Sequence, residues 1–309
     1  MEPLLYKHAY NTKLIPDRYF PDYHFTMLND TRRNTLYNTA LAKYAPNQVV
    51  LDLGSGSGLL SMMALRAGAK KVFAVEQDTL LAQLSRTILA KNGLLDDRIH
   101  IINAPIAQLT GGHEIDEPVD LIVTELFDCG LIGEGCIKSI ADAKFFLKPG
   151  GRVLPKKGSI HAFLVNSEQL RTQHLLHDDV MGFDLSALIE LRQVGYMDRI
   201  AYYTDCRIVS DKICLLTLDF QRDLPATIAQ TVSFTVQQDT QIDAMIVYFK
   251  LALAQNVTLV SLSSRASHWD QWFLFPKQSM HVHKGATVAV NIHNDTREKL
   301  MASMWSVSN

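Results

Sequence analysis

Residues 49–58 read "VVLDLGSGSG", and this stretch determines the expected fold. The run "VVLDL" at 49–53 is short and continuously apolar, which is typical of a strand buried on both faces of a parallel sheet. Three glycines follow at positions 54, 56 and 58, where they permit a tight turn and close approach of a ligand. The next residues, "LLSMMALRAGA", have helical spacing, so the stretch predicts a strand, a glycine loop and a helix.

The same alternation of strand and helix continues as far as residue 154. A second strand, "KVFAVE", ends at Glu76, a helix is expected over about 78–93, and "IHIINA" is a third strand. A fourth strand, "VDLIVTEL", covers 119–126; a helix near 136–147 follows, and "RVLP" opens another strand. This order predicts a doubly wound α/β domain with right-handed crossovers, similar to a Rossmann fold.

Beyond residue 154 the pattern changes to short alternating strands, which predict an antiparallel β sandwich or barrel. We therefore expect two domains, residues 1–153 and residues 154–309. The stretch 184–214 interrupts the strands with a sequence that has an apolar helical face, "DLSALIELRQVGYMDRIAYYTD" in its main part. It is interpreted as a protruding arm, with a simple inserted hairpin as the alternative.

The composition is that of an ordinary globular protein. The chain has 309 residues, of which 47% are hydrophobic and 20% charged, and its net charge is −2. That charge gives no overall basic field for nucleic acid or anionic membranes. The four cysteines have no metal-ligand spacing and are expected as free thiols. No signal peptide or transmembrane run is evident, so we expect an intracellular protein, cytoplasmic or nuclear, with no membrane partner.

The glycine loop has two acidic neighbours. Asp52 lies two residues before Gly54, and Glu76 ends the next strand, where it can accept hydrogen bonds from both ribose hydroxyls of a nucleoside. The GxGxG spacing differs from the GxGxxG of dinucleotide-binding proteins, and an NAD(P) enzyme is the less favoured alternative. The other alternative is a glycine turn that serves only packing, with Glu76 capping the helix that follows. The pattern resembles that of Rossmann-like S-adenosylmethionine-dependent methyltransferases.

Residues 124–135, "TELFDCGLIGEG", place Glu125 at the carboxyl end of the fourth strand and Glu134 nine positions later. In an open α/β sheet, ligands bind outside the carboxyl ends of the strands. Two carboxylates that come together there repel each other unless a cation is bound between them. Apart from Asp128, no histidine or further carboxylate lies at a spacing that would complete a metal site with these glutamates. A planar guanidinium, which pairs bidentately with carboxylates, is the favoured cation.

Four separated motifs together resemble those of the protein arginine methyltransferases. They are "VVLDLGSGSG", the double-glutamate loop "TELFDCGLIGEG", "SHWDQW" at 267–272 and "MLNDTRRN" at 27–34. The resemblance extends from about Tyr19 to the C-terminus. It implies transfer of a methyl group from S-adenosylmethionine, with S-adenosylhomocysteine as product, to the ω-guanidino nitrogen of arginine in proteins. It also implies a β-barrel substrate domain, a dimerisation arm and no metal.

Carried onto this sequence, the resemblance implies two sets of residues. His268 would pair with Asp30 and help to remove a proton, and Trp269 accompanies His268 in the substrate-binding loop. Glu125 and Glu134 would bind the substrate guanidinium. The residues implied for the cofactor are Arg33 for the methionine carboxylate, Asp52, Gly54, Gly56 and Gly58 for its methionine and ribose portion, and Glu76 for the ribose hydroxyls. Asp30 is also expected to cap the helix that begins near Thr31, and Asp128 to hydrogen-bond the loop backbone.

Some features of the sequence indicate a branch of this family, and others depart from the common family pattern. Ala107 stands where many relatives have a glutamate that binds adenine, and the N-terminal stretch is short. The motifs look closest to the branch of monomethylating (type III) and symmetric enzymes. Since such relatives often contain two tandem modules and this chain has room for one, we expect a homodimer. The alternatives are a methyltransferase for a small guanidino or amine metabolite, and an inactive relative that regulates a partner.

Overall fold

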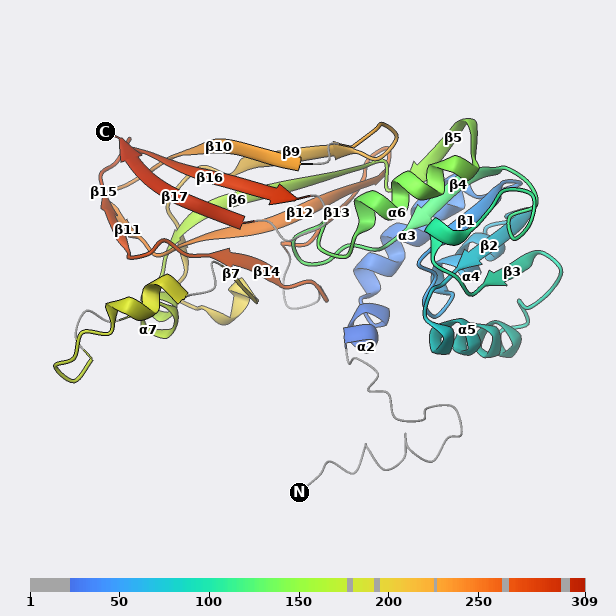
Figure 1. Cartoon of the computed structure of the whole chain (residues 1–309), viewed down its shortest axis with the longest axis horizontal. Helices are drawn as coiled ribbons and strands as arrows, with labels where there is room; N and C mark the ends of the chain where they lie inside the picture. The colour runs from blue at the N-terminus through green and yellow to red at the C-terminus, as the bar shows by residue number, and fades with distance from the viewer. Residues whose placement is uncertain are drawn as a thin grey trace, which may run out of the picture. The chain divides into compact units, whose positions relative to one another are not determined.

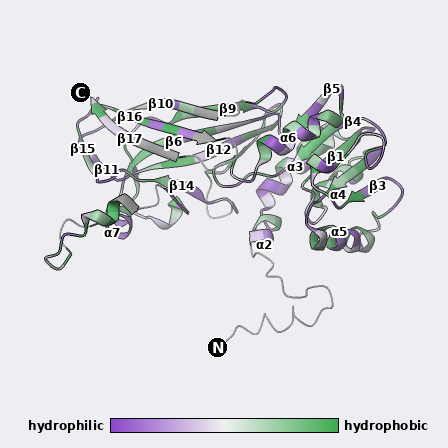
Figure 2. Cartoon of the chain, viewed as in Figure 1, coloured by the Kyte–Doolittle hydropathy of each residue, from purple (hydrophilic) through white to green (hydrophobic). Residues whose placement is uncertain are grey.

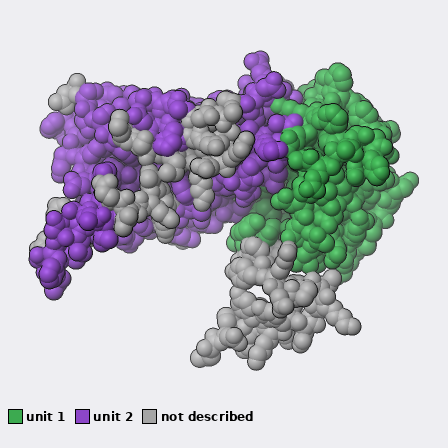
Figure 3. Space-filling view, viewed as in Figure 1, with its two compact units in different colours: residues 1–125, 142–152 green, residues 126–141, 153–309 purple. Residues whose placement is uncertain are grey.

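The computed structural model describes residues 23–176, 180–191, 195–224, 227–262, 267–295 and 301–308. The chain divides into two compact units, residues 1–125 with 142–152 and residues 126–141 with 153–309 (Figure 3). The segment 126–141, which follows the fourth strand, groups with the second unit and not with the domain in which sequence placed it. The division of the chain into two functional domains, with the boundary between residues 153 and 154, stays a prediction.

The first unit contains the parallel sheet expected from sequence. Its strands lie in the order β3-β2-β1-β4-β5, and the pairs β1–β2, β2–β3 and β1–β4 are parallel (Figure 1). Every residue of β1 is buried, as its continuous apolar run predicts. The strands are β1 (Val49–Leu53), β2 (Lys71–Val75), β3 (Ile99–Ile102), β4 (Val119–Thr124) and β5 (Leu147–Leu154).

The chain order of these strands reverses between β1 and β4, since β2 and β3 lie on one side of β1 and β4 lies on the other. Open α/β sheets bind ligands outside the carboxyl ends of the strands at such a reversal. The helices that accompany the sheet are α2 (Tyr23–Leu28), α3 (Thr31–Tyr44), α4 (Leu59–Arg66), α5 (Thr79–Lys91) and the short 3-10 helices η1 (Ile106–Gln108) and η2 (Lys144–Phe146). One difference from the sequence prediction is that β5 begins at Leu147, because an edge strand tolerates Pro149 and Gly150.

The second unit is built from antiparallel strands, as the alternating pattern predicts. β12 (Ala244–Ala254) pairs with β6 (Lys157–Asn166) along nine register positions and forms the centre of the largest sheet. That sheet has the order β7-β14-β12-β6-β8, with β13 on β12 and β9 on β6. The remaining strands form β10-β16-β17 and β11-β15. Apolar stretches appear as green segments among purple hydrophilic ones on both units (Figure 2).

The other elements of the second unit are as follows: α6 (Cys136–Ala143, shared with the first unit), α7 (Glu168–His174), η3 (Ser186–Leu191), β7 (Gly195–Asp198), η4 (Ile200–Tyr202), β8 (Arg207–Ile208), β9 (Ile213–Asp219), β10 (Thr227–Thr235), β11 (Thr240–Ile242), β13 (Val257–Val260), β14 (Gln271–Leu274), β15 (Met280–Val282), β16 (Thr287–Asp295) and β17 (Met301–Ser308). A core cluster lies between α7 and the central strands and includes Phe163, Leu170, Ile246 and Phe273.

The expected arm at 184–214 contains less helix than its pattern predicts. Where the structure describes it, at 184–191 and 195–214, its only helices are η3 and η4. The remainder includes β7, which pairs with β14, and β8, which pairs with β6. A protruding helical arm and closure of the strands into a barrel therefore stay predictions. Among the described residues, no helix has the length and apolarity that crossing a membrane requires.

Candidate active site

The glycine loop lies at the carboxyl end of β1 and is fastened to the end of β2. Gly54, Gly56 and Gly58 have positive φ values of 72°, 53° and 81°, which glycine adopts without the steric cost of a Cβ. The backbone N–H groups of Gly54 and Ser55 both donate to the carbonyl oxygen of Val75, at 2.9 and 3.0 Å. The turn therefore sits directly beside Glu76, the residue after β2.

Glu76 is 7% exposed and is held by two backbone hydrogen bonds. Its Oε2 accepts from the N–H of Gly56 and its Oε1 from the N–H of Asp78, each at 2.8 Å. Glu76 is not the cap of the following helix: Asp78 is the N-cap of α5, and its Oδ1 accepts from Leu81 N–H at 3.0 Å. The Gly56 N–H is thus committed to Glu76, so Gly56 orients this carboxylate. Each oxygen keeps a second lone pair for a ligand hydroxyl.

Asp52 is fully buried in β1 and only partly hydrogen-bonded. The hydroxyl of Ser61 donates to Oδ2 at 2.6 Å, while Oδ1 has no partner. Burial raises the pKa of Asp52 to about 6, Glu76 adds to the rise, and the Ser61 hydrogen bonds oppose it. Ser61 was not predicted from the sequence; the available signal was a single hydroxyl in the otherwise apolar helix start "LLSMMAL".

Arg33 and Glu125 bind each other, although sequence assigned them to different ligands. Arg33 Nη2 lies 2.5 Å from Glu125 Oε2, and both side chains are 5% exposed. Asp30 caps α3 as predicted, since its Oδ1 accepts from Arg33 N–H at 2.9 Å. Burial raises the pKa of Glu125, while the guanidinium and its hydrogen bond act in the opposite direction. The contact demonstrates that Glu125 can bind a guanidinium in this environment.

Tyr37 supports this ion pair and was not predicted from sequence. Its ring lies 5.5 Å from the guanidinium carbon of Arg33, and its hydroxyl donates to the carbonyl oxygen of Thr124 at 3.0 Å. Tyr37 is fully buried and one helical turn after Arg33. The i, i+4 spacing on α3 was the available signal. Tyr37 therefore connects α3 to the residue directly before Glu125.

The part of the double-glutamate loop that lies in the second unit, from Leu126 onward, is closed by the carboxylate of Asp128. Asp128 Oδ1 accepts from Gly133 N–H at 2.9 Å, and Leu131 N–H donates to the carbonyl oxygen of Asp128 at 3.0 Å. This confirms the prediction that Asp128 hydrogen-bonds the loop backbone. Leu131 has a φ of 79° and is fully buried, a strained conformation that its packing must offset.

The same loop is tied to the "SHWDQW" segment. Trp269, 3% exposed, donates from Nε1 to the carbonyl oxygen of Phe127 at 2.8 Å. The rings of His268 and Trp269 have centroids 3.7 Å apart. Two motifs separated by more than a hundred residues thus meet, with Trp269 as a structural tie. The next residue, Asp270, pairs with Arg199 at 2.8 Å, which links the segment to the region of the expected arm.

The two glutamates belong to different units. Glu125 is the last residue of the first unit before the chain enters the second, and Glu134 is an exposed residue of the second. Asp30 and His268 are divided in the same way. The guanidinium clamp of Glu125 with Glu134 and the pairing of His268 with Asp30 therefore stay predictions.

The first unit fits a polar nucleoside ligand at the carboxyl ends of its strands. Three buried polar side-chain atoms there have no hydrogen-bond partner: Arg33 Nε, Asp52 Oδ1 and Ser55 Oγ. Buried polar groups are normally paired, so these atoms have capacity for a ligand. A Cβ at Gly56 would meet nothing within 4 Å, so the space beside the loop is open. No group of three or more side chains suited to a metal occurs among the described residues.

Comparisons with known proteins agree with this arrangement. The family model for the arginine methyltransferase oligomerization subdomain matches residues 156–305, and that for ribosomal protein L11 methyltransferase matches residues 36–155. An arginine N(omega)-methyltransferase from Streptomyces achromogenes subsp. streptozoticus is 34% identical over 281 residues, covering 90% of this chain and 77% of that relative. Protein arginine N-methyltransferase 9 of Homo sapiens is 28% identical, and this chain spans only 34% of its length.

A solved structure has the same fold. In the Trypanosoma brucei PRMT1 enzyme-prozyme heterotetrameric complex with AdoHcy, one chain superposes with a TM-score of 0.78 at 27% identity, covering 88% of this chain and 87% of that one. The parallel sheet with its glycine loop and two carboxylates defines a methyltransferase that depends on S-adenosylmethionine. The chain belongs to the arginine methyltransferase family.

Proposed function

We propose that this chain methylates an ω-nitrogen of arginine in proteins or peptides and that its product is monomethylarginine. The observation that supports a guanidinium acceptor most directly is the buried ion pair of Glu125 with Arg33; the proposed product, monomethylarginine, depends on the resemblance to the type III branch. An acceptor arginine would present the same chemical group to the same carboxylate. A guanidinium keeps its positive charge at all accessible pH values, so the site must bind the acceptor as a cation. Carboxylates bind such a cation best, because they pair with it bidentately.

In this proposal, Arg33 binds the carboxylate of the methyl donor, Glu76 accepts hydrogen bonds from its ribose, and Asp52 with the loop at 54–58 holds the remainder. S-adenosylmethionine supplies an electrophilic methyl group on a sulfonium. Glu125 and Glu134 grip two nitrogens of the acceptor guanidinium and leave the third aligned for attack. Such positioning contributes up to about 7–11 kcal/mol in well-oriented reactions.

The reaction also releases one proton, and the remaining residues are proposed to accept it or to position the substrate. As the N–C bond forms, the C–S bond breaks, S-adenosylhomocysteine leaves, and the nitrogen loses one proton. We assign acceptance of this proton to His268 with Asp30 as its partner. Trp269 holds the loop of Glu134 through Phe127, so it acts on substrate binding through position.

A homodimer is the second part of the proposal. Large hydrophobic side chains are exposed in and beside the expected arm: Met181 at 90%, Phe183 at 69%, Leu188 at 54%, Met197 at 41% and Tyr202 at 60%. A concentration of apolar surface of this kind is typical of a protein interface. The match of residues 156–305 to an oligomerization subdomain supports the same conclusion.

A second candidate acceptor is free arginine. The name of the Streptomyces relative specifies arginine and no protein, and that relative aligns with 90% of this chain. The same pair of glutamates would serve a free guanidino compound. A third candidate, an inactive relative that regulates a partner, has the intact set of proposed site residues against it.

One product analysis separates these candidates. The purified protein is incubated with methyl-labelled S-adenosylmethionine and either an arginine- and glycine-rich peptide or free arginine. Acid hydrolysis and chromatography then identify the methylarginines. Label in peptidyl monomethylarginine, at a kcat/KM well above that for free arginine, is expected. Faster turnover of free arginine would reverse the choice of acceptor, and no label in either, with the cofactor bound, would contradict an active enzyme.

A further inference from the structure

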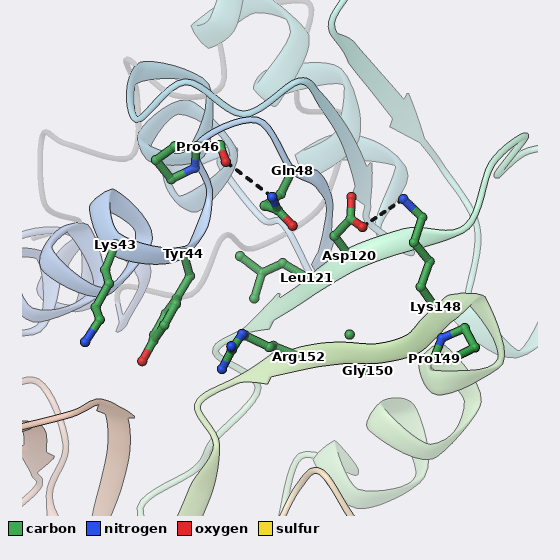
Figure 4. A pocket seen from close by; sticks show the side chains of 11 residues that line it. Lys43, Tyr44, Pro46, Gln48, Asp120, Leu121, Lys148, Pro149, Gly150 and Arg152 are labelled. Carbon is green, nitrogen blue, oxygen red and sulfur yellow. Dashed lines mark hydrogen bonds and ion pairs between the residues drawn. The ribbon is translucent and has the colours of Figure 1, made fainter.

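A pocket lies in the first unit at the amino ends of the parallel strands, opposite to the glycine loop at their carboxyl ends. It is a pocket of about 450 Å3, lined by the end of α3, the link from α3 to β1, the start of β4 and the first part of β5 (Figure 4). Gln48 immediately precedes β1, and Asp120 is the second residue of β4. These are the amino ends of the strands, whereas the glycine loop follows their carboxyl ends. The volume is within the usual range for small-molecule sites.

The single acidic group of this pocket is already neutralised. Asp120 Oδ1 accepts from Lys148 Nζ at 2.7 Å, and its Oδ2 accepts from the backbone N–H of Val49 at 2.9 Å. In Figure 4 the Lys148 side chain points to Asp120 at one side of the pocket. Asp120 and Lys148 thus cancel in charge and contribute no net attraction for an ion.

Two further cations remain uncompensated. Lys43 and Arg152 are both exposed, and neither makes an ion pair with any residue that the structure describes. Both border the ring of Tyr44: Lys43 Nζ lies 5.5 Å and the guanidinium carbon of Arg152 5.3 Å from its centroid. The face of a tyrosine ring attracts cations and helps to keep both side chains at the pocket. The pocket therefore has a net charge of about +2, although the whole chain has −2.

We propose that this pocket binds a small phosphorylated molecule carrying at least two negative charges. A guanidinium binds phosphate through paired N–H groups, and a lysine ammonium adds a mobile point charge. Gly150 has a φ of 79°, and a Cβ there would meet nothing within 4 Å, so the lining of the pocket at β5 leaves room for close approach. Tyr44, Leu121 and Pro149 provide non-ionic surface for the remainder of such a molecule. This site is independent of the proposed methyl transfer.

Calorimetric titration with pyrophosphate and with ATP tests the proposal. Both titrations are done at low ionic strength with the cofactor crevice saturated by S-adenosylhomocysteine, so that nucleotide binding there does not contribute. Saturable binding is expected in the wild-type protein. The Lys43→Gln/Arg152→Gln double variant should bind at least about tenfold more weakly, the loss of two charge-assisted contacts. Both residues are exposed, and a thermal unfolding curve verifies that the variant is folded.

Lys91→Gln provides the matched control, because Lys91 is an exposed lysine at the end of α5 and makes no ion pair among the described residues. It should bind both probes like wild type. Tighter binding of ATP than of pyrophosphate would support a nucleotide-sized ligand, and equal binding would support recognition of the phosphates alone. No saturable binding, or unchanged binding by the double variant, would overturn the proposal. A single-stranded oligonucleotide that binds more tightly than ATP through the same residues would overturn the assignment to a small molecule.

Discussion

Arg33 donates a hydrogen bond from Nη2 to Glu125 Oε2 at 2.5 Å, inside a part of the first unit where both side chains are 5% exposed. Arg33, proposed to bind the cofactor, is thus bonded to Glu125, which is proposed to bind the substrate. A buried charge needs a partner at all times, because leaving it unpaired costs several kcal/mol. An acceptor guanidinium can use Glu125 fully only when Arg33 has another anion. The carboxylate of the cofactor would be that anion in the proposed function.

The first prediction follows for Arg33→Lys. Lysine keeps the charge but loses the planar fork, so the affinity for S-adenosylhomocysteine should fall about 10- to 100-fold, equivalent to one strong charge-assisted contact. Isothermal calorimetry measures this directly. The matched control is Arg32→Lys, since Arg32 is the exposed neighbour on the same helix. Equal affinities of the two variants would exclude a direct role of Arg33 in cofactor binding.

The second prediction concerns the two glutamates. Glu125→Gln and Glu134→Gln should each lower kcat/KM for the peptide by about 100-fold or more, because each removes a charged hydrogen bond to the acceptor guanidinium. Affinity for S-adenosylhomocysteine should change less than threefold for Glu134→Gln, which lies outside the first unit. Rates are measured by transfer of labelled methyl groups. Glu117→Gln serves as the control, because Glu117 is bonded only to Lys70 and Lys71 among the described ion pairs and is not a proposed site residue.

The sequence predicted the secondary structure of the first unit more accurately than that of the arm. "VVLDLGSGSG" predicted β1, the glycine turn and α4, because a buried parallel strand and positive φ values both have strong local signals. The arm was predicted as helix from an apolar face, but β7 in that region pairs with β14, and strand pairing over 70 residues has no local signal. Tertiary contacts outweigh helical propensity in such a segment.

The site shows the same limit. Sequence placed Asp52 and Glu76 beside the glycine loop from their positions in and after the first two strands, and the family resemblance added Arg33 to the cofactor site. The resemblance assigned Arg33 and Glu125 to separate ligands. Their direct ion pair could not be predicted, because the position of α3 against the end of β4 depends on long-range contacts such as that of Tyr37 with Thr124. Ser61 was missed for a related reason: a lone serine in an apolar helix becomes significant only when Asp52 is found beneath it.

A third prediction uses the titration of Asp52. Its pKa in the folded chain is about 6, against an ordinary value of 3.8, so between these values the folded state binds more protons than the unfolded state. Stability due to Asp52 is therefore present below pH 3.8, falls as the pH rises to about 6 and stays lower above it. Asp52→Asn avoids this loss, and should be more stable than wild type at pH 7 by about 3 kcal/mol as an upper bound.

Urea unfolding at pH 4 and pH 7 measures this effect. The difference in unfolding free energy between Asp52→Asn and wild type should grow with pH across the window. Affinity for S-adenosylhomocysteine should fall in the same variant, since the carboxylate is proposed to bind the cofactor. A stability difference that does not change with pH would show that Asp52 titrates normally in the folded protein.

The fourth prediction compares two glycines of the double-glutamate loop. A Cβ at Gly133 would approach the carboxylate of Asp128 far more closely than real contacts allow, and Asp128 is fixed by the N–H of Gly133 itself. A Cβ at Gly130 would meet the same carboxylate at 3.5 Å, an ordinary contact. Gly133→Ala should therefore displace Asp128 and lower kcat/KM by about tenfold or more, since small misplacements near reacting groups are costly.

Gly130→Ala is the matched control and should retain most of the activity. Methyl-transfer assays on both variants, with circular dichroism to verify folding, provide the comparison. If the two variants are equally active, the closure of the loop by Asp128 has no effect on the position of Glu134.

The fifth prediction addresses the proposed homodimer. Phe183 and Leu188 are 69% and 54% exposed, so replacing both with serine should leave the fold intact and weaken an interface that they form. Analytical ultracentrifugation should then give the monomer mass of 34.7 kDa at concentrations where wild type has twice that value. The control is Phe145→Ser, a 76% exposed aromatic residue of the first unit.

Activity should fall together with dimerisation, because the region of the arm is bonded to the segment of His268. β7 pairs with β14, Ile200 N–H donates to the side chain of Gln271 at 3.0 Å, and Arg199 binds Asp270 at 2.8 Å. Loss of order in the arm would therefore reach the loop that Trp269 ties to Phe127. A monomeric variant with full activity would contradict this coupling, and a dimer in spite of both substitutions would place the interface elsewhere.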